Sequence, residues 1–400
     1  MASARSTTQI VSSIISDVRK NGDGALVRLA AKFDKAKLTA RTLRVPTERF
    51  RKAFNALDDD MRKALESCAR RIQDFHYQEK KHVPESWTYV KDGVRLGQIY
   101  SPIESVGIYV PGGRFSYPST LLMTAIPARL AGVRRIAVVT PSGKLTNEIL
   151  AAAHVAGVQE LYQVGGPAAV AALAIGTETI AKVDIIVGPG NALVTEAKRQ
   201  LFGEVGIDLL AGPSELAVLA DDTANAVTVA ADMAAQAEHD PDARSYLISL
   251  SKKVVADVRA QLPAELRSRC VLTYEPDRRK AIEKVNALAA EHVQILMQRP
   301  QDCLDTIKNG GAIFLNEWSP AVMGDYWAGP SHVLPTGRSA RFASGLSVTT
   351  FLKRSSLIEI SGGAYRKGWT AAHKMAESEG LTQHARSIRS RVPNEEPVKV

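Results

Sequence analysis

Short β-branched segments alternate with alanine-rich segments between about Val94 and Asp221. The β-branched segments predict strands at residues 105–110, 135–140, 160–164, 184–187 and 216–220. The alanine-rich segments predict helices at residues 119–131, 147–156, 168–175 and 191–202. Because strands that alternate with helices form a parallel sheet covered on both faces, we predict an α/β fold.

Helices are also predicted at both ends of the chain. Apolar residues between Ile10 and Val18 recur at helical spacing, and the turn at residues 21–24 (NGDG) is expected to end that helix. Thr47 is a candidate N-cap, and a long charged helix is expected over residues 58–81. Further strands are predicted near residues 246–250, 293–297 and 312–316, and the region from residue 346 onward is expected to be mostly helical. We therefore predict two incomplete Rossmann-like parallel-sheet domains with helical N- and C-terminal extensions.

The composition is that of a globular protein. The chain has 400 residues, of which 45% are hydrophobic and 23% are charged, and this length predicts more than one core. The net charge is +9, but the basic clusters are not interleaved with aromatic residues, so no nucleic-acid partner is expected. No apolar run of about 18 residues occurs, so no membrane span is expected. The polar N-terminus predicts no signal peptide.

The three cysteines, Cys68, Cys270 and Cys303, are far apart in the sequence. This spacing argues against a disulfide framework or a thiolate zinc site, and it is typical of a reducing cytoplasm.

Glycines gather at the carboxyl ends of three predicted strands. They are the pairs at residues 112–113 and 165–166 and the loop at 188–191 (GPGN). Ligands of open α/β sheets bind outside these strand ends, where glycine lets the backbone approach a phosphate. Each loop alone is more often an ordinary turn, and the fingerprint G-x-G-x-x-G is absent. Three such loops at one edge favour a ligand site.

Four histidines lie near acids or amides in the sequence: His239, His292, His332 and His384. Gln236 and His239 are three residues apart, so they would share one face of a helix. Imidazole and oxygen ligands without thiolate suit zinc or another divalent first-row metal. For any single histidine, a chance position on the surface is the better interpretation. The other four histidines show no partner pattern.

The same segments together resemble the histidinol dehydrogenase family. The resemblance covers nearly the whole chain, from about residue 8 to residue 391, in one order. The matching segments are residues 109–113 (YVPGG), 188–198 (GPGNALVTEAK), 206–208 (GID), 211–215 (AGPSE), 236–240 (QAEHD), 291–292 (EH), 324–326 (GDY) and 331–336 (SHVLPT). The combination is far more specific than any one of these motifs.

The resemblance implies an NAD-dependent oxidation of L-histidinol to L-histidine through L-histidinaldehyde, the last step of histidine biosynthesis. It implies one zinc ion per subunit, bound by Gln236, His239, Asp325 and His384. It also implies a cytoplasmic homodimer in which Glu379 and His384 complete the partner's site.

Further roles follow from the resemblance by matching position. The implied acid/base pair is Glu291 and His292. The implied substrate contacts are Ser214, Gln236, His239, His292, Asp325, His332, Glu379 and His384, and the implied NAD contacts are Tyr109 and Asn191. The implied domains are residues 109–214 for NAD, residues 1–108 with 215–345 for substrate and metal, and residues 346–400 for dimerisation.

The chemistry agrees with the implied roles of Glu291 and His292. Oxidation of a primary alcohol requires loss of the hydroxyl proton, which a histidine can accept near neutral pH. The aldehyde must then be hydrated, and a neighbouring carboxylate can activate the water. Adjacent residues of an extended strand point to opposite faces, so we expect this pair at a strand's start or a bend.

The chain departs from the resembled family in three ways, of which the mildest is Ser331 in place of the family's usual asparagine before His332. Where the family usually has a glutamine that contacts NAD, this chain has Ala168, so that hydrogen bond, worth about 1 kcal/mol, is in question. The chain also begins later than typical members, which puts part of the dimer contact in question.

Two alternatives remain at the level of sequence. A relative of the family could oxidise another small polar alcohol, such as a sulfonated diol. A basic, non-catalytic scaffold on the same fold is the other. The complete set of site residues favours histidinol over both.

Overall fold

The computed structural model describes residues 6–112 and 116–392. Gly113, part of the first predicted glycine pair, lies outside the described residues. The chain divides into two compact units. The first comprises Met1–His82 with Ile103–Phe351, and the second comprises Val83–Pro102 with Leu352–Val400.

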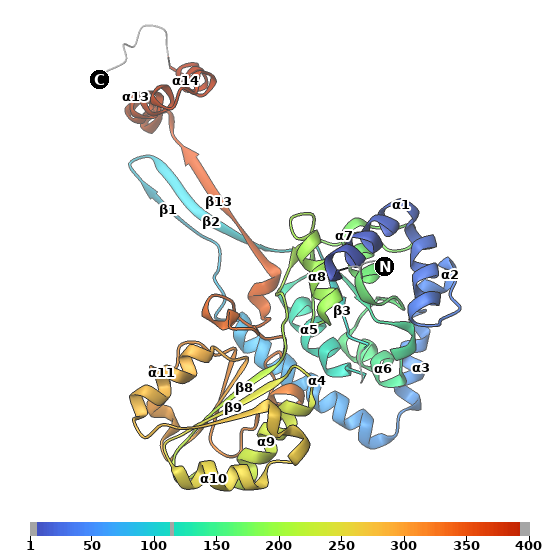
Figure 1. Ribbon diagram of the computed structural model, residues 1–400. Coiled ribbons are helices and arrows are strands. Elements are labelled where there is room, and N and C mark those ends of the chain that lie inside the picture. Colours follow the sequence, from blue (N-terminus) through green and yellow to red (C-terminus); the bar gives the residue numbers. More distant parts are fainter. Residues whose placement is uncertain (1–5, 113–115, 393–400) are drawn as a thin grey trace. The chain divides into compact units, whose positions relative to one another are not determined.

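The first unit contains two five-stranded parallel sheets (Figure 1). The first sheet has the order β5-β4-β3-β6-β7. Its strands are β3 (Ser105–Tyr109), β4 (Arg135–Val139), β5 (Glu160–Tyr162), β6 (Ile185–Val187) and β7 (Gly206–Ile207). Its helices are α5 (Pro118–Ala131), α6 (Asn147–Ala156), α7 (Gly166–Ile175) and α8 (Ala192–Leu201). The predicted strands and helices of this region are confirmed to within two residues at each end, and the two-residue β7 was not predicted.

The second sheet has the order β10-β9-β8-β11-β12. Its strands are β8 (Glu215–Ala220), β9 (Arg244–Ser249), β10 (Cys270–Tyr274), β11 (His292–Leu296) and β12 (Ala312–Leu315). Its helices are α9 (Ala226–Glu238), α10 (Lys252–Gln261), α11 (Arg278–Leu288) and α12 (Ala321–Tyr326). Short 3-10 turns occur at Ser142–Lys144, Ala264–Arg269, Pro300–Cys303, Ser339–Arg341 and Val348–Phe351.

The two sheets share one strand order and therefore equivalent switch points. In each sheet the first strand in the sequence lies at the centre, with later strands added on both sides. The direction of winding reverses between β3 and β6 in the first sheet and between β8 and β11 in the second. Such switch points are where doubly wound sheets bind their ligands.

Apolar helix faces cover both sheets. Buried residues of α1, α7 and α8 form one cluster with the first sheet, including Val139 and Ile186. Buried residues of α9 and α10 cover one face of the second sheet, and residues of α11 cover the other. The inner strands β3, β8 and β11 are almost wholly buried on both faces, as the interior of a parallel sheet requires, whereas the edge strands β10 and β12 are partly exposed.

Four helices precede the first sheet: α1 (Thr7–Phe33), α2 (Ala40–Leu43), α3 (Glu48–Ala56) and α4 (Asp59–Lys80). The long charged helix is confirmed as α4, and Thr47 is the N-cap of α3. The expected helix end at residues 21–24 is wrong. α1 continues through this turn with a kink at Gly22, where φ is 47° and ψ is −131°. Asp23 follows the kink and accepts hydrogen bonds from Thr177 and Thr179, which hold α1 against the first sheet.

The second unit is built on a three-stranded antiparallel sheet in the order β1-β2-β13. The strands are β1 (Trp87–Lys91), β2 (Val94–Pro102) and β13 (Leu352–Ile360), followed by α13 (Gly362–Ser378) and α14 (Thr382–Arg389). The region from residue 346 onward was expected to be mostly helical, but it also supplies the nine-residue β13.

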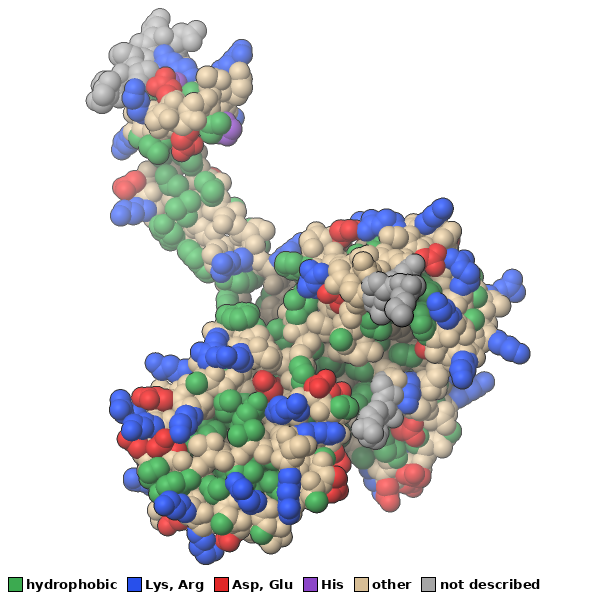
Figure 2. Space-filling view, viewed as in Figure 1, with side chains coloured by type: hydrophobic (Ala, Val, Ile, Leu, Met, Phe, Trp, Pro, Cys, Tyr) green, Lys and Arg blue, Asp and Glu red, His purple; other side chains and the backbone are tan. Residues whose placement is uncertain are grey.

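This sheet carries many exposed hydrophobic side chains, visible in green along its strands in Figure 2. They are Trp87, Tyr89, Val90, Ile99, Ile358 and Ile360, each at least 45% exposed. Among the described residues, no helix combines the length and the hydrophobicity needed to cross a membrane.

Candidate active site

The buried pair Glu291 and His292 lies at the amino end of β11. The preceding helix α11 ends at Ala289, whose positive φ of 49° turns the chain into the strand. Glu291 comes immediately before the strand, and His292 is its first residue, paired with Leu216 and Ala312 of the neighbouring strands. The expectation that the pair occupies a strand's start is therefore confirmed.

Burial dominates the electrostatics of Glu291. Its side chain is only 6% exposed, and desolvation raises the pKa of its carboxyl to about 8. Hydrogen bonds from the Ser214 side chain and from the Glu215 N–H (3.3 Å to Oε2) act in the opposite direction. At neutral pH a large fraction of Glu291 is therefore protonated.

His292 is shifted in the direction opposite to that of Glu291. It is 4% exposed, and burial lowers the pKa of its imidazole, although the nearby Asp325 carboxylate partly opposes the shift. Its Nε2 lies 3.7 Å from Asp325 Oδ1 and its Nδ1 lies 3.8 Å from Glu291 Oε2. Nδ1 has no hydrogen-bond partner among the described residues. His292 is thus a neutral, buried base with ring positions close to two carboxyl groups.

Asp325 and His239 lie near this pair, and Gln236 lies one helical turn before His239. Gln236 is buried in the last turn of α9, and His239 is the exposed C-cap of the same helix. Asp325 lies in α12, where burial raises the pKa of its carboxyl against the influence of His292 and His239. Because α9 runs back along β8, its carboxyl end meets the amino edge of the sheet where His292 begins.

A second polar contact joins α9 to β11. Gln294 is fully buried two residues after His292, on the same face of the strand. Its side-chain amide donates to Asp232 Oδ2 at 2.7 Å, one helical turn before Gln236. Sequence reasoning missed both residues, although a glutamine inside the apolar run of β11 was a usable signal.

His332 connects the two sheets of the first unit. One ring nitrogen, Nδ1, lies 3.0 Å from the Asp325 carbonyl, and the other, Nε2, lies 2.9 Å from Thr120 Oγ1 on α5. Burial lowers the pKa of His332 to about 4, so its ring is neutral. The carboxyl edge of the first sheet, where α5 begins, therefore lies beside the amino edge of the second.

The predicted metal ligands are divided between the two units. Gln236, His239 and Asp325 belong to the first unit, while His384 lies exposed on α14 in the second. Glu379, a predicted substrate contact, is the exposed C-cap of α13 in the second unit. Across residues 6–112 and 116–392, no group of three or more His, Cys, Asp or Glu side chains converges to hold a metal ion.

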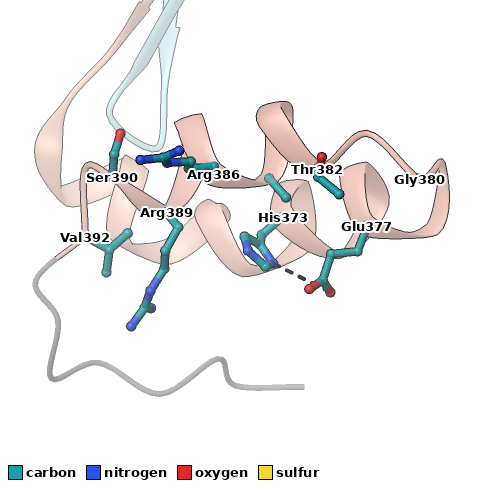
Figure 3. Close-up of a pocket in the computed structure, with 9 residues that line it drawn as sticks. His373, Glu377, Gly380, Thr382, Arg386, Arg389, Ser390 and Val392 are labelled. Atoms are coloured by element: carbon teal, nitrogen blue, oxygen red, sulfur yellow. Dashed lines mark ion pairs between the residues drawn. The ribbon is translucent and has the colours of Figure 1, made fainter.

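A pocket of about 560 Å³ lies between α13 and α14 in the second unit (Figure 3). On its α13 side, Nδ1 of His373 lies 3.7 Å from Oε2 of Glu377. Arg386 and Arg389 line the pocket from α14. Neither Glu379 nor His384 is among its lining residues. The pocket is therefore distinct from the predicted site residues.

The glycine loops and both predicted NAD contacts lie at the carboxyl edge of the first sheet. Tyr109 ends β3, and its buried hydroxyl accepts the Gly166 N–H at 3.1 Å. Burial raises the pKa of Tyr109 to about 12, so the phenol stays protonated. Asn191 caps α8, where its side-chain oxygen accepts from the N–H groups of Leu193 and Val194.

Glycine is required in this edge for close packing. A Cβ on Gly112 or on Gly165 would lie 2.4 Å from the ring of Pro141, so the loops after β3, β4 and β5 touch. Gly166 has a positive φ of 62° with open space where a Cβ would stand. Ala168, by contrast, is 5% exposed and packs into the core. The glycine loops at this carboxyl edge, called the glycine cradle below, lie at the end of the sheet where doubly wound folds bind their ligands.

Comparison with known proteins identifies the same family along the whole chain. The family described as histidinol dehydrogenase matches residues 1–392. Histidinol dehydrogenase of Agrobacterium fabrum is 47% identical, over 96% of this chain and 91% of that protein. That of Thermosynechococcus vestitus is 44% identical, over 96% and 92%.

A solved structure shows the same fold. The crystal structure of histidinol dehydrogenase from Elizabethkingia anophelis is 33% identical and has a TM-score of 0.89, covering 98% of this chain and 93% of that one. Sequence and structure thus agree over both sheets and over the second unit. The chain belongs to the histidinol dehydrogenase family.

Proposed function

We propose that this chain, an oxidoreductase of histidine biosynthesis, oxidises L-histidinol to L-histidine in two NAD-dependent steps. The observation that carries the proposal is the buried pair Glu291 and His292, which lies beside Asp325 at the edge facing the glycine cradle. An uncharged acid and an uncharged base, side by side and shielded from water, suit a reaction that moves several protons.

The first step converts the alcohol to an aldehyde. His292 accepts the proton of the hydroxyl, and bound NAD would accept the hydride from the carbinol carbon. The lowered pKa of His292 keeps its imidazole neutral and ready to accept this proton. Asp325, 3.7 Å from Nε2, stabilises the imidazolium that forms.

The second step converts the aldehyde to the carboxylate. Water adds to the carbonyl, two further protons are released, and bound NAD would accept the second hydride. Glu291 transfers protons during hydration, since a carboxyl with a pKa of about 8 exists in both forms near neutrality. Ser214 orients that carboxyl through its hydrogen bond.

NAD is proposed to bind at the glycine cradle, in the region 109–214. NAD supplies the hydride acceptor in both steps. Tyr109 and Asn191 stand at the switch point, and the open space beside Gly166 leaves room for a ligand against the backbone. The side chain of Ala168 offers no hydrogen bond to the cofactor.

Zinc is proposed to be held by Gln236, His239 and Asp325, with His384 as the fourth ligand. The donors are nitrogen and oxygen atoms, which suit zinc. The unpartnered Nδ1 of buried His292 supports the proposal of a polar ligand at this edge. Bound zinc would hold the nitrogen atoms of the substrate, whose reacting carbon is then placed beside His292.

The chain is proposed to act as a cytoplasmic homodimer, in which Glu379 and His384 complete the partner's site together with His332 and Ser214. The exposed apolar side chains of the β1-β2-β13 sheet support a dimer, because a monomer rarely exposes so many on one small sheet.

The decisive experiment is turnover of L-histidinol with NAD by the purified full chain. We expect two NADH per histidinol, loss of turnover on chelation and recovery with zinc. A single NADH per substrate, or full activity after verified metal removal, would contradict the two-step or the zinc part of the proposal respectively.

A further inference from the structure

A buried ion pair lies directly beneath the loop that joins β6 to α8. Lys198 Nζ lies 2.5 Å from Asp208 Oδ1, and the two side chains are only 3% and 2% exposed. Lys198 comes from the middle of α8, whereas Asp208 follows β7 at the edge of the first sheet. Removing two charges from water is costly, so the pair needs compensating hydrogen bonds.

Both side chains also form a hydrogen bond with Gly188. Lys198 Nζ donates to the Gly188 carbonyl at 2.6 Å, and Asp208 Oδ2 accepts the Gly188 N–H at 2.6 Å. The Leu209 N–H also donates to Asp208, at 2.6 Å. The ion pair therefore fixes the two peptide groups that flank the Gly188 Cα.

Gly188 is a position that tolerates no other residue. Its φ is +109°, and a Cβ there would lie 2.3 Å from the carbonyl oxygen of Tyr109. The β6 loop thus runs against the end of β3 at the switch point. A peptide in this conformation, so close to another backbone, is held in place by the charges beneath it.

We propose that Lys198 and Asp208 are positioning residues for the nicotinamide nucleotide. The pair holds the 188–191 loop against Tyr109 and sets the start of α8, where Asn191 caps the helix. The inference rests on the proposed nucleotide site, and it adds two residues that do not themselves reach the ligand.

Burial and partners exclude a direct role for either side chain. The Lys198 ammonium is 3% exposed and is already engaged by Asp208 and the Gly188 carbonyl, so it is not free to contact a phosphate. The pair also carries no net charge. Its effect on the nucleotide must therefore pass through the backbone of the loop.

The test compares K198M, D208N and the double variant K198M/D208N. Each single variant leaves one buried charge unpaired and is expected to lose stability. The double variant removes both charges with little change of shape, so its stability should recover toward that of the wild type. E160Q is the matched control, because it breaks the Arg135–Glu160 ion pair at the amino edge of the same sheet, away from the cradle.

The readouts are the Kd for NAD by calorimetry, the KM for L-histidinol at saturating NAD, and amide hydrogen exchange over residues 188–194. In the double variant we expect an NAD Kd raised about 10-fold to 100-fold and faster exchange in the loop, with the histidinol KM within about twofold. E160Q should lower the melting temperature and leave the Kd and the loop exchange unchanged.

A double variant that is stable, binds NAD as tightly as the wild type and protects the loop amides equally would overturn the inference. If the wild type binds no NAD, the proposed cofactor site fails instead. In that case hydrogen exchange in the 188–194 loop still tests whether the ion pair orders the loop. If it does not, exchange should be the same in K198M/D208N and in E160Q.

Discussion

At the scale of single residues, burial moves Glu291 and His292 toward the same uncharged state. Desolvation penalises the charged form of each group, so it raises the pKa of the acid and lowers that of the base. At neutral pH the Glu291 carboxyl therefore carries a proton, and the His292 imidazole is neutral and can accept one. Neighbouring groups shifted in this way can exchange acid and base roles between two steps.

Replacing His292 by glutamine should remove the proton acceptor and keep the polarity of the site. We expect kcat to fall by about 10²- to 10⁴-fold, the usual contribution of general base catalysis, with zinc content and melting temperature little changed. NADH production and metal analysis measure these quantities. H154Q is the control, since His154 is an exposed residue of α6 that contacts Phe54. Equal turnover in wild type and H292Q would remove His292 from the mechanism.

Glu291 should also make the stability of the fold depend on pH. Its pKa is about 8 in the folded chain and near 4.5 when unfolded, so the folded state binds the extra proton between these values. The protonated carboxyl of Glu291 contributes fully to the free energy of unfolding below pH 4.5. This contribution decreases as the pH rises and is lost above about pH 8. E291Q cannot ionise and should escape this loss.

Thermal melts of the metal-free wild type and E291Q at pH 5 and pH 8.5 measure this effect. The melting temperature of E291Q relative to that of the wild type should be higher at pH 8.5 than at pH 5. A difference that is the same at both values would show that Glu291 ionises normally in the folded chain.

At the scale of elements, periodicity predicted eight of the ten strands of the two parallel sheets, because each of those eight is a short, mostly apolar run, and it missed β7 and β10. The same reasoning missed β1, β2 and β13, whose sequences mix lysine, arginine, serine and glycine with apolar residues. Alternating burial is the signal that identifies an antiparallel strand, and β1 is exposed at every position. The strands of the second unit therefore lack the pattern that sequence reasoning uses.

The kink in α1 shows a second limit. A turn sequence such as NGDG ordinarily ends a helix, but Asp23 is captured by threonines of another segment, and the helix resumes. Tertiary contacts overrode a correct local preference.

Gly22→Ala should destabilise the fold, because the backbone at φ 47° and ψ −131° excludes a side chain and the Cβ would lie 2.3 Å from the Glu178 carboxylate. We expect a loss of about 2 kcal/mol or more in the free energy of unfolding, measured by urea denaturation. Gly24→Ala in the same helix is the control. Its Cβ would meet only Arg28 at 3.5 Å, so it should be neutral or stabilise by about 0.5–1 kcal/mol. Equal losses in both variants would contradict the strain at Gly22.

At the scale of the whole molecule, the site lies at two unlike sheet edges. The carboxyl edge of the first sheet follows the general rule for doubly wound folds, so glycine loops after strands predicted it. The candidate catalytic pair lies at the amino edge of the second sheet, which no such rule indicates. The start of a strand was predicted for this pair only because Glu291 and His292 are adjacent and must act on the same substrate. The contacts of Thr120, Asp232 and Gln294 join segments far apart in sequence, so no local pattern contained them.

The division of the proposed zinc ligands between units allows a direct test of the dimer. H292Q disables the base in the first unit, and H384N removes a ligand from the second. If His384 acts in the partner's site, each variant alone is inactive, but a heterodimer contains one site with both defects and one with neither. Random exchange of subunits in an equal mixture makes half of the dimers mixed, so about a quarter of wild-type activity should return.

An equal mixture of H292Q and H384N is unfolded and refolded together, or incubated until subunits exchange. Its NADH production is then compared with that of each variant treated alone. An equal mixture of H292Q with H239N is the control, because both changes fall in the first unit and no exchange can create an intact site. If His384 acts within its own chain, the H292Q and H384N mixture should stay as inactive as this control, since every site then keeps one defect.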